Sequence, residues 1–154
     1  MSNTEYKTSD STKPIALPVW FWVVSLLAML WFLMDMSAFF MRVTVTEEAR
    51  MMMTGRDQYL HRDYPLWVNM VFAFEVFGGL LGSLALLLKR RLALVLFALS
   101  LMGVLGQSSF VYFISDAIDV LGMPLILMPL LSIAIGTAMI AVSRRAIAQR
   151  WLYK

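Results

Sequence analysis

Residues 65–91 read PLWVNMVFAFEVFGGLLGSLALLLKRR. Up to Leu88 this stretch contains one ionisable side chain, Glu75, and three basic residues follow it directly. About twenty consecutive apolar residues suffice for an α-helix to cross a hydrocarbon core of roughly 30 Å. Pro at the first turn and Trp67 near the start suit a helix that begins at a membrane interface. Residues 65–88 are therefore predicted to form a transmembrane helix.

The composition of the whole chain agrees with this interpretation. Of the 154 residues, 60% are hydrophobic and 15% are charged, whereas a soluble domain is about half apolar and a quarter charged. A small globule could not bury so much apolar surface, so the excess is expected to face lipid. The chain has no cysteine, which excludes disulfides, thiol nucleophiles and thiolate-bound metal clusters.

Three further stretches are long and apolar enough to span a bilayer, and turns or basic residues separate them. They are residues 17–41, 92–115 and 123–142. The predicted fold is all-α: an antiparallel up-down four-helix transmembrane bundle over residues 17–143.

The segments outside the spans are polar. Residues 1–16 are predicted to be a disordered cytoplasmic tail, and residues 144–154 a basic cytoplasmic tail suited to anionic headgroups. In the loop between the first two spans, Thr46 followed by two glutamates is typical of a helix start. We expect a short amphipathic helix over the outer face of the bundle, ending at Gly55.

The orientation follows from the distribution of basic residues. Placing both termini in the cytoplasm puts nine basic residues inside and four outside, as the positive-inside rule prefers. The inner nine are Lys7, Lys13, Lys89, Arg90, Arg91, Arg144, Arg145, Arg150 and Lys154, and the outer four are Arg42, Arg50, Arg56 and Arg62. Topology thus explains the net charge of +3, and nucleic acid is not expected as a partner.

The stretch Val76–Arg91, VFGGLLGSLALLLKRR, preceded by YPLW at 64–67, resembles a family of small bacterial four-span proteins that is sometimes labelled "sugar transporter". The resemblance covers most of the chain from Pro18 onward and implies four spans in the bacterial inner membrane. It also includes Trp31, Leu101–Gln107 and Asp119–Gly122, whereas Phe32, Asp35 and Ala38 depart from the family pattern of the first span.

Two carboxyl groups are predicted to lie inside the bilayer, where an ionisable side chain costs roughly 2.5 to 3.5 kcal/mol and needs a partner or a function. Glu75 falls near the middle of its span, and Asp35 lies outside the midplane of the first. Three polar residues fall in the same layer: Gln107, Ser108 and Ser132. One interpretation is a polar site that binds protons or a cationic solute. The other is that Glu75 is neutral and hydrogen-bonded, while Asp35 reaches headgroups or a loop arginine.

Small residues spaced four apart predict close helix contacts. On the second span these are Gly78 with Gly82 and Gly79 with Ser83; on the fourth, Ser132 pairs with Gly136. Pro129 is expected to bend the fourth span. These patterns indicate packing more directly than a transport hinge.

No motif in the chain predicts an enzyme, a cofactor or a metal site. The chain has no Ser/His/Asp arrangement, HExxH or phosphate-binding glycine loop. Met51–Met53 with Met41 and His61 could supply soft ligands for Cu(I), but adjacent methionines on a helix point in different directions. Interfacial packing is the simpler interpretation.

Two hypotheses for the function remain open. The first is a small-solute or ion transporter with a polar intramembrane site, acting as a homodimer because four spans complete few pathways alone. The second is a non-transporting structural or accessory subunit that packs through its glycine faces onto a larger membrane complex. The position of Glu75 and Asp35, in a hydrated site or at an interface, distinguishes the two.

Overall fold

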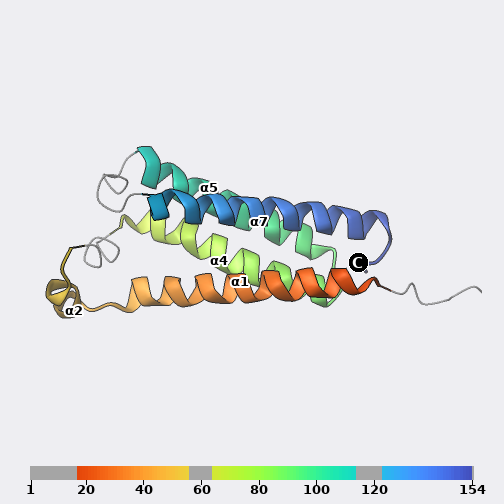
Figure 1. The fold of residues 1–154 in the computed structure, drawn as a ribbon, viewed down its shortest axis with the longest axis horizontal. Coiled ribbons are helices and arrows are strands. Elements are labelled where there is room, and N and C mark those ends of the chain that lie inside the picture. The colour runs from red at the N-terminus through yellow and green to blue at the C-terminus, as the bar shows by residue number, and fades with distance from the viewer. Residues whose placement is uncertain (1–16, 56–63, 114–122, 154) are drawn as a thin grey trace, which may run out of the picture.

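The computed structural model describes residues 17–55, 64–113 and 123–153 (Figure 1). The predicted tail at residues 1–16 and His61 lie outside this part. Within the described part, the helices are α1 (Val19–Thr44), α2 (Glu47–Met52), α4 (Leu66–Leu87), α5 (Leu92–Phe113) and α7 (Met123–Ala148).

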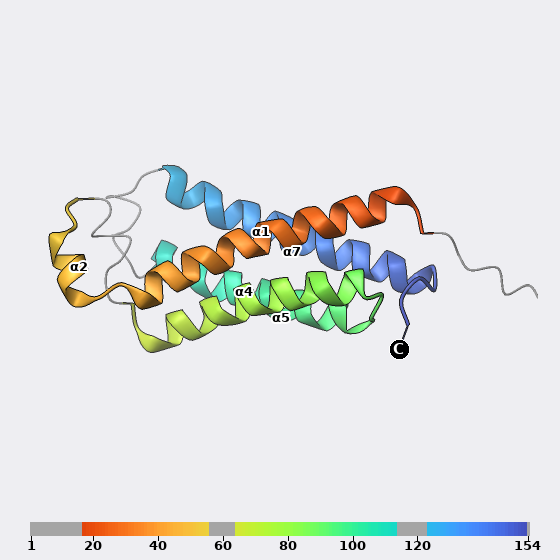
Figure 2. The same cartoon turned by 90° about the horizontal axis from the view of Figure 1, so that it is seen from below.

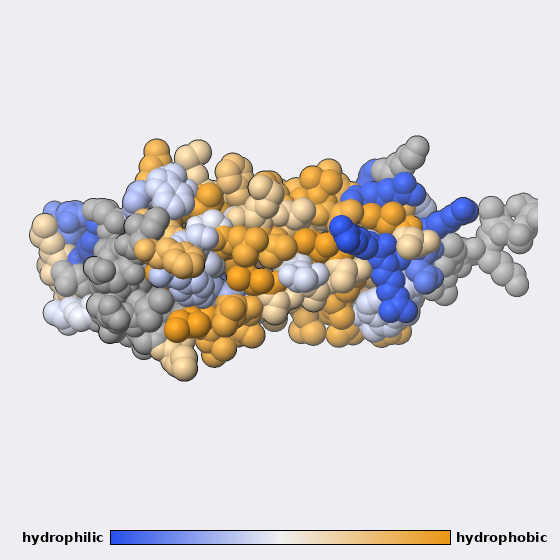
Figure 3. Space-filling view, turned by 90° about the horizontal axis from the view of Figure 1, so that it is seen from above, coloured by the Kyte–Doolittle hydropathy of each residue, from blue (hydrophilic) through white to orange (hydrophobic). Residues whose placement is uncertain are grey.

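The all-α prediction is confirmed, since four long apolar helices pack together as a bundle. In the described part of the chain, each of these four is long and apolar enough to cross a membrane. Hydrophobic residues dominate the middle of the surface in Figure 3, and hydrophilic residues lie toward both ends. We call the end that carries Lys89–Arg91 and Arg144–Arg145 the basic end, and the opposite end the α2 end.

Two helices extend beyond the predicted membrane spans. The predicted spans end at about Met41 and about Val142. In the structure α1 continues to Thr44 and α7 to Ala148. Arginine is a good helix former whose long side chain can reach an interface, so a charge does not end the backbone helix.

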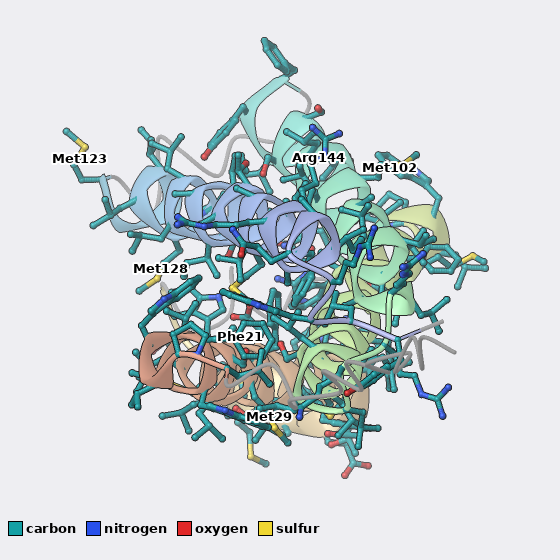
Figure 4. All side chains as sticks on the ribbon, turned by 90° about the vertical axis from the view of Figure 1, so that its right-hand side faces the viewer. Phe21, Met29, Met102, Met123, Met128 and Arg144 are labelled. Atoms are coloured by element: carbon teal, nitrogen blue, oxygen red, sulfur yellow. The ribbon has the colours of Figure 1, made fainter. Side chains whose placement is uncertain are left out.

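The helices follow one another around the bundle in chain order. α4 packs on both α1 and α5, and α7 packs on α5 (Figure 4). Half of the most apolar stretch of α4 is buried, against 17% for α1 and 22% for α7. The α4–α5 hairpin is therefore the centre of the fold, and α1 and α7 lie outside it.

Glycines on α4 bring its two neighbours close. Gly78 and Gly82 face α5, where a Cβ on Gly78 would meet the Leu96 carbonyl oxygen at 2.9 Å. Gly79 faces α1, and a Cβ there would overlap the Phe32 ring. The two overlapping small-residue pairs thus serve two different helices. On α7, Gly136 lies against Leu101 of α5.

The C-terminal segment, predicted to be a basic tail, folds back onto the bundle. After α7, Arg150 adopts a left-handed φ of 57° and turns the chain back across the basic end. The backbone N–H of Tyr153 donates to the Lys89 carbonyl, and the N–H of Arg91 donates to the Tyr153 carbonyl. Leu152 is buried, and Trp151 packs on Phe21. The segment therefore ties α7 to the α4–α5 turn.

The short helix α2 begins where the sequence predicts. The Thr46 side chain accepts a hydrogen bond from the Ala49 N–H at 3.2 Å, and Glu47 and Glu48 occupy the first turn. The helix ends at Met52 rather than at Gly55, which has a φ of +59° beyond it. Figures 1 and 2 show α2 beyond the end of the long helices, and none of its residues is buried.

Candidate functional site

The two intramembrane acids lie at the same depth in the bundle. Asp35 is nine residues from the end of α1, and Glu75 is nine residues from the start of α4. At about 1.5 Å per residue, both lie about 14 Å from the α2 end. Glu75 is 5% exposed, Asp35 is half-buried, and the two carboxyl groups are close enough to interact electrostatically.

The backbone of α4 fixes the position of Glu75. Gly103 of α5 lies directly against it, because a Cβ on Gly103 would meet the Glu75 backbone nitrogen at 2.6 Å. The Ser100 hydroxyl donates to the Glu75 carbonyl oxygen at 2.7 Å. One turn to either side, Phe72 and Gly79 contact α1. Glu75 therefore lies where α4 meets both α1 and α5.

Arg42 lies close to Glu75 in the structure. Its guanidinium lies over the Tyr64 ring at 4.7 Å and over the Phe72 ring at 4.4 Å, and it interacts electrostatically with Glu75. From the sequence, Arg42 is expected in the outer loop, and it was therefore not predicted as a site residue. Its spacing of seven from Asp35, two helical turns on the same face, could have revealed it.

Several buried polar atoms around these groups have no hydrogen-bond partner among the described residues. An unsatisfied buried polar atom costs about 1 to 3 kcal/mol, so a group of them requires an explanation. Three helices contribute to the group, which we call the polar cluster. Its unpartnered atoms are Asp35 Oδ2, Arg42 Nη1, Asn69 Oδ1, Glu75 Oε2, Gln107 Oε1 and Ser108 Oγ. The Trp31 indole lies within hydrogen-bonding reach of the Asp35 carboxyl group.

The sequence-predicted residues on α5 and α7 stand in different relations to the acids. Gln107 lies one turn beyond Gly103 toward the α2 end, and Ser108 is buried beside it. Ser109 is exposed and donates to its own helix. Ser132 is half-buried and lies at the depth of the acids, but α7 packs on α5 rather than on α1 or α4. The structure thus brings Asp35, Glu75 and Arg42 together but not Ser132.

The methionines weighed as copper ligands are largely exposed. Met51 and Met52 have exposed fractions of 73% and 84% on α2, and Met41 is exposed on α1. Across the described residues, no three or more His, Cys, Asp or Glu side chains are grouped as metal ligands.

Comparisons of the chain with family models, with curated proteins and with solved structures found no match. In length and composition, the four long apolar helices are compatible with a multi-pass membrane protein. Its polar cluster is the feature from which a function can be argued.

Proposed function

We propose that this chain is a non-enzymatic inner-membrane protein of the small bacterial four-span family it resembles. It transports an ion or a small solute and binds a proton or a small monovalent cation at Asp35 and Glu75. Its basic end faces the cytoplasm, as the excess of lysine and arginine there favours. The observation that carries the proposal is the convergence of two carboxyl groups and one guanidinium among buried, unpartnered polar atoms.

The charges of the cluster support a monovalent positive ligand. Two ionised carboxylates and one guanidinium leave one negative charge unbalanced in surroundings where an isolated charge is costly. One proton or one small cation removes that imbalance. Release of the same ligand restores it, so the cluster has two states whose relative populations depend on ligand concentration.

The depth of the cluster supports exchange of the ligand with the solution at the α2 end. Asp35 and Glu75 lie about 14 Å from that end, close to half of a hydrocarbon core of roughly 30 Å. Arg42 and Tyr64 lie between the acids and this end of the bundle. A ligand entering from the periplasmic side would therefore pass the guanidinium first, and movement of Arg42 would open or close the route.

The contacts of the α4 glycines favour the transport proposal over the accessory-subunit hypothesis. Gly78, Gly79 and Gly82 are buried against α5 and α1 of the same chain and are not available to a partner. We keep the homodimer as part of the transport proposal, because four helices enclose few complete pathways.

Infrared difference spectroscopy between two pH values tests ligand binding at the cluster, since a protonated carboxyl group has a carbonyl band that a carboxylate lacks. We expect a band that responds to pH and disappears in Glu75→Gln. Glu48→Gln is the matched control, because it makes the same change on the exposed surface of α2. A shift of the band on adding Na⁺ or K⁺ at constant pH would identify a cation as the ligand.

Liposomes loaded with a pH-sensitive dye test the transport function. Under an imposed gradient, we expect proton or cation flux through the wild type and through Glu48→Gln, and loss of flux in Glu75→Gln. Circular dichroism in detergent checks that both variants fold. Flux in Glu75→Gln equal to that of the wild type, or no flux in any of the three, would refute the transport proposal.

A further inference from the structure

A groove runs between α1 and α7 on the face where these two helices do not pack closely. It has a volume of about 400 Å³ and an almost entirely apolar lining. Val24, Ala28 and Trp31 contribute from α1, and Ile135, Ala138 and Met139 from α7. We propose that this groove binds an acyl chain of an anionic glycerophospholipid whose phosphate lies at Arg145.

The length of the groove matches one leaflet of a bilayer. On α1 its lining runs from Val24 to Met34, ten residue steps or about 15 Å of helix. Half of a hydrocarbon core is also about 15 Å. The groove therefore extends from just inside the basic end to near the middle of the membrane, as an acyl chain of that leaflet does.

The basic end of the groove carries a positive charge where a lipid phosphate would lie. Arg145 is two turns from Ala138 on the same face of α7, and its guanidinium lies over the Trp20 ring of α1 at 5.7 Å. Trp20 is in turn one helical turn from Val24. Arg145 and Trp20 thus meet across the end of the groove, and tryptophan is enriched at the headgroup level of membranes.

Arg144 provides a matched control for this charge. It is exposed like Arg145, but in Figure 4 it lies on the side of α7 away from α1, whereas Phe21 lies between these helices. A general attraction of the basic end to anionic lipid would depend on both arginines. Binding of a lipid phosphate at the end of the groove would depend on Arg145 alone.

Native mass spectrometry of the detergent-solubilised protein tests the site with phosphatidylglycerol, phosphatidylcholine of the same acyl chains, and inorganic phosphate. We expect phosphatidylglycerol to bind about fivefold more tightly than phosphatidylcholine, the effect of one basic residue near an anionic surface. Arg145→Gln should remove this preference and Arg144→Gln should keep it. Inorganic phosphate should not compete, because it lacks the acyl chain.

Filling the groove tests the acyl-chain half of the site. Ala138→Phe should weaken binding of both lipids. Ala141→Phe, on an exposed part of α7 outside the groove, should not. Ala138→Leu repeats the test with a smaller side chain if the phenylalanine variant does not fold.

Three outcomes would overturn the assignment: equal affinity for the two lipids, equal loss of preference in Arg144→Gln and Arg145→Gln, or competition by inorganic phosphate. If the protein forms a dimer and Ala138→Phe abolishes it, the groove instead binds a second copy of the chain.

Discussion

The α4–α5 pair and the α1–α7 pair are made of equally apolar helices, yet only the first pair packs closely. α4 and α5 meet through Gly78, Gly82 and Gly103, so that their backbones touch. α1 and α7 are separated by a groove. In lipid, apolar side chains gain little by leaving the solvent, so close association depends on small residues and interhelical hydrogen bonds. Where a helix pair lacks them, lipid can remain between the helices.

The largest loss of stability is expected from disrupting the contact between α4 and α5. In Gly103→Ala, the new Cβ would meet the Val71 carbonyl oxygen and the Glu75 nitrogen, both at 2.6 Å. These are backbone atoms, so α4 and α5 must separate. We expect a loss of about 2 to 3 kcal/mol in unfolding titrations in mixed micelles, at the upper end of overpacking effects.

Gly106→Ala is the matched control on the same helix. Its new Cβ would lie 3.6 Å from the nearest Val71 carbon, an ordinary contact. Because alanine favours a helix over glycine by about 1 kcal/mol, this variant should be neutral or slightly stabilised. Equal destabilisation of the two variants would show that backbone contact at Gly103 does not hold the hairpin together.

A smaller loss of stability is expected from removing the charge through which α1 interacts with the α4–α5 hairpin. Arg42→Met keeps most of the length of the side chain but removes the cation that interacts with Glu75. We expect a loss of about 1 to 2 kcal/mol, less than for a fully buried pair because Arg42 is half-buried.

The double variant Arg42→Met/Glu75→Gln separates charge from packing. If the loss comes from unbalanced carboxylates, the second change should recover at least half of it in the same unfolding titration, giving a double-mutant coupling. The single variant Glu75→Gln provides the third corner of the cycle. Additive losses would mean that Arg42 acts through its contacts with Tyr64 and Phe72 alone.

The fold could be predicted because it depends on long stretches of similar residues, which can be seen directly in the sequence. Four long apolar stretches and basic residues at their ends determine the helices, their order and their antiparallel arrangement. The exact helix ends depend on where charged side chains point, and α1 and α7 continue past the predicted spans to include Arg42 and Arg144. The docking of Leu152 depends on a left-handed turn at Arg150, a non-glycine residue that gives no signal for it.

The candidate site was predicted only in part. Glu75 and Asp35 could be found because a charge in an apolar span is conspicuous. Their shared depth was not predicted, because the sequence put Asp35 outside the midplane of a first span that ended at Met41, whereas α1 continues to Thr44. The contribution of Trp31 and Asn69 depends on which helix faces point inward, and apolar stretches with weak periodicity do not reveal that. Ser132 had the right depth, but its helix packs on α5.

The smallest change in stability is expected from a substitution in the groove between the outer helices α1 and α7. Ala138→Leu adds three carbons to a side chain that borders the groove, where the space is open, and α7 needs no adjustment. We expect a change of less than about 0.5 kcal/mol in the same titration. Ala85→Leu makes the same change in the buried core of α4 and should cost about 1 to 3 kcal/mol. If Ala138→Leu destabilises the protein as much as Ala85→Leu does, α1 and α7 pack as closely as the inner pair, and the groove has no room for a lipid chain.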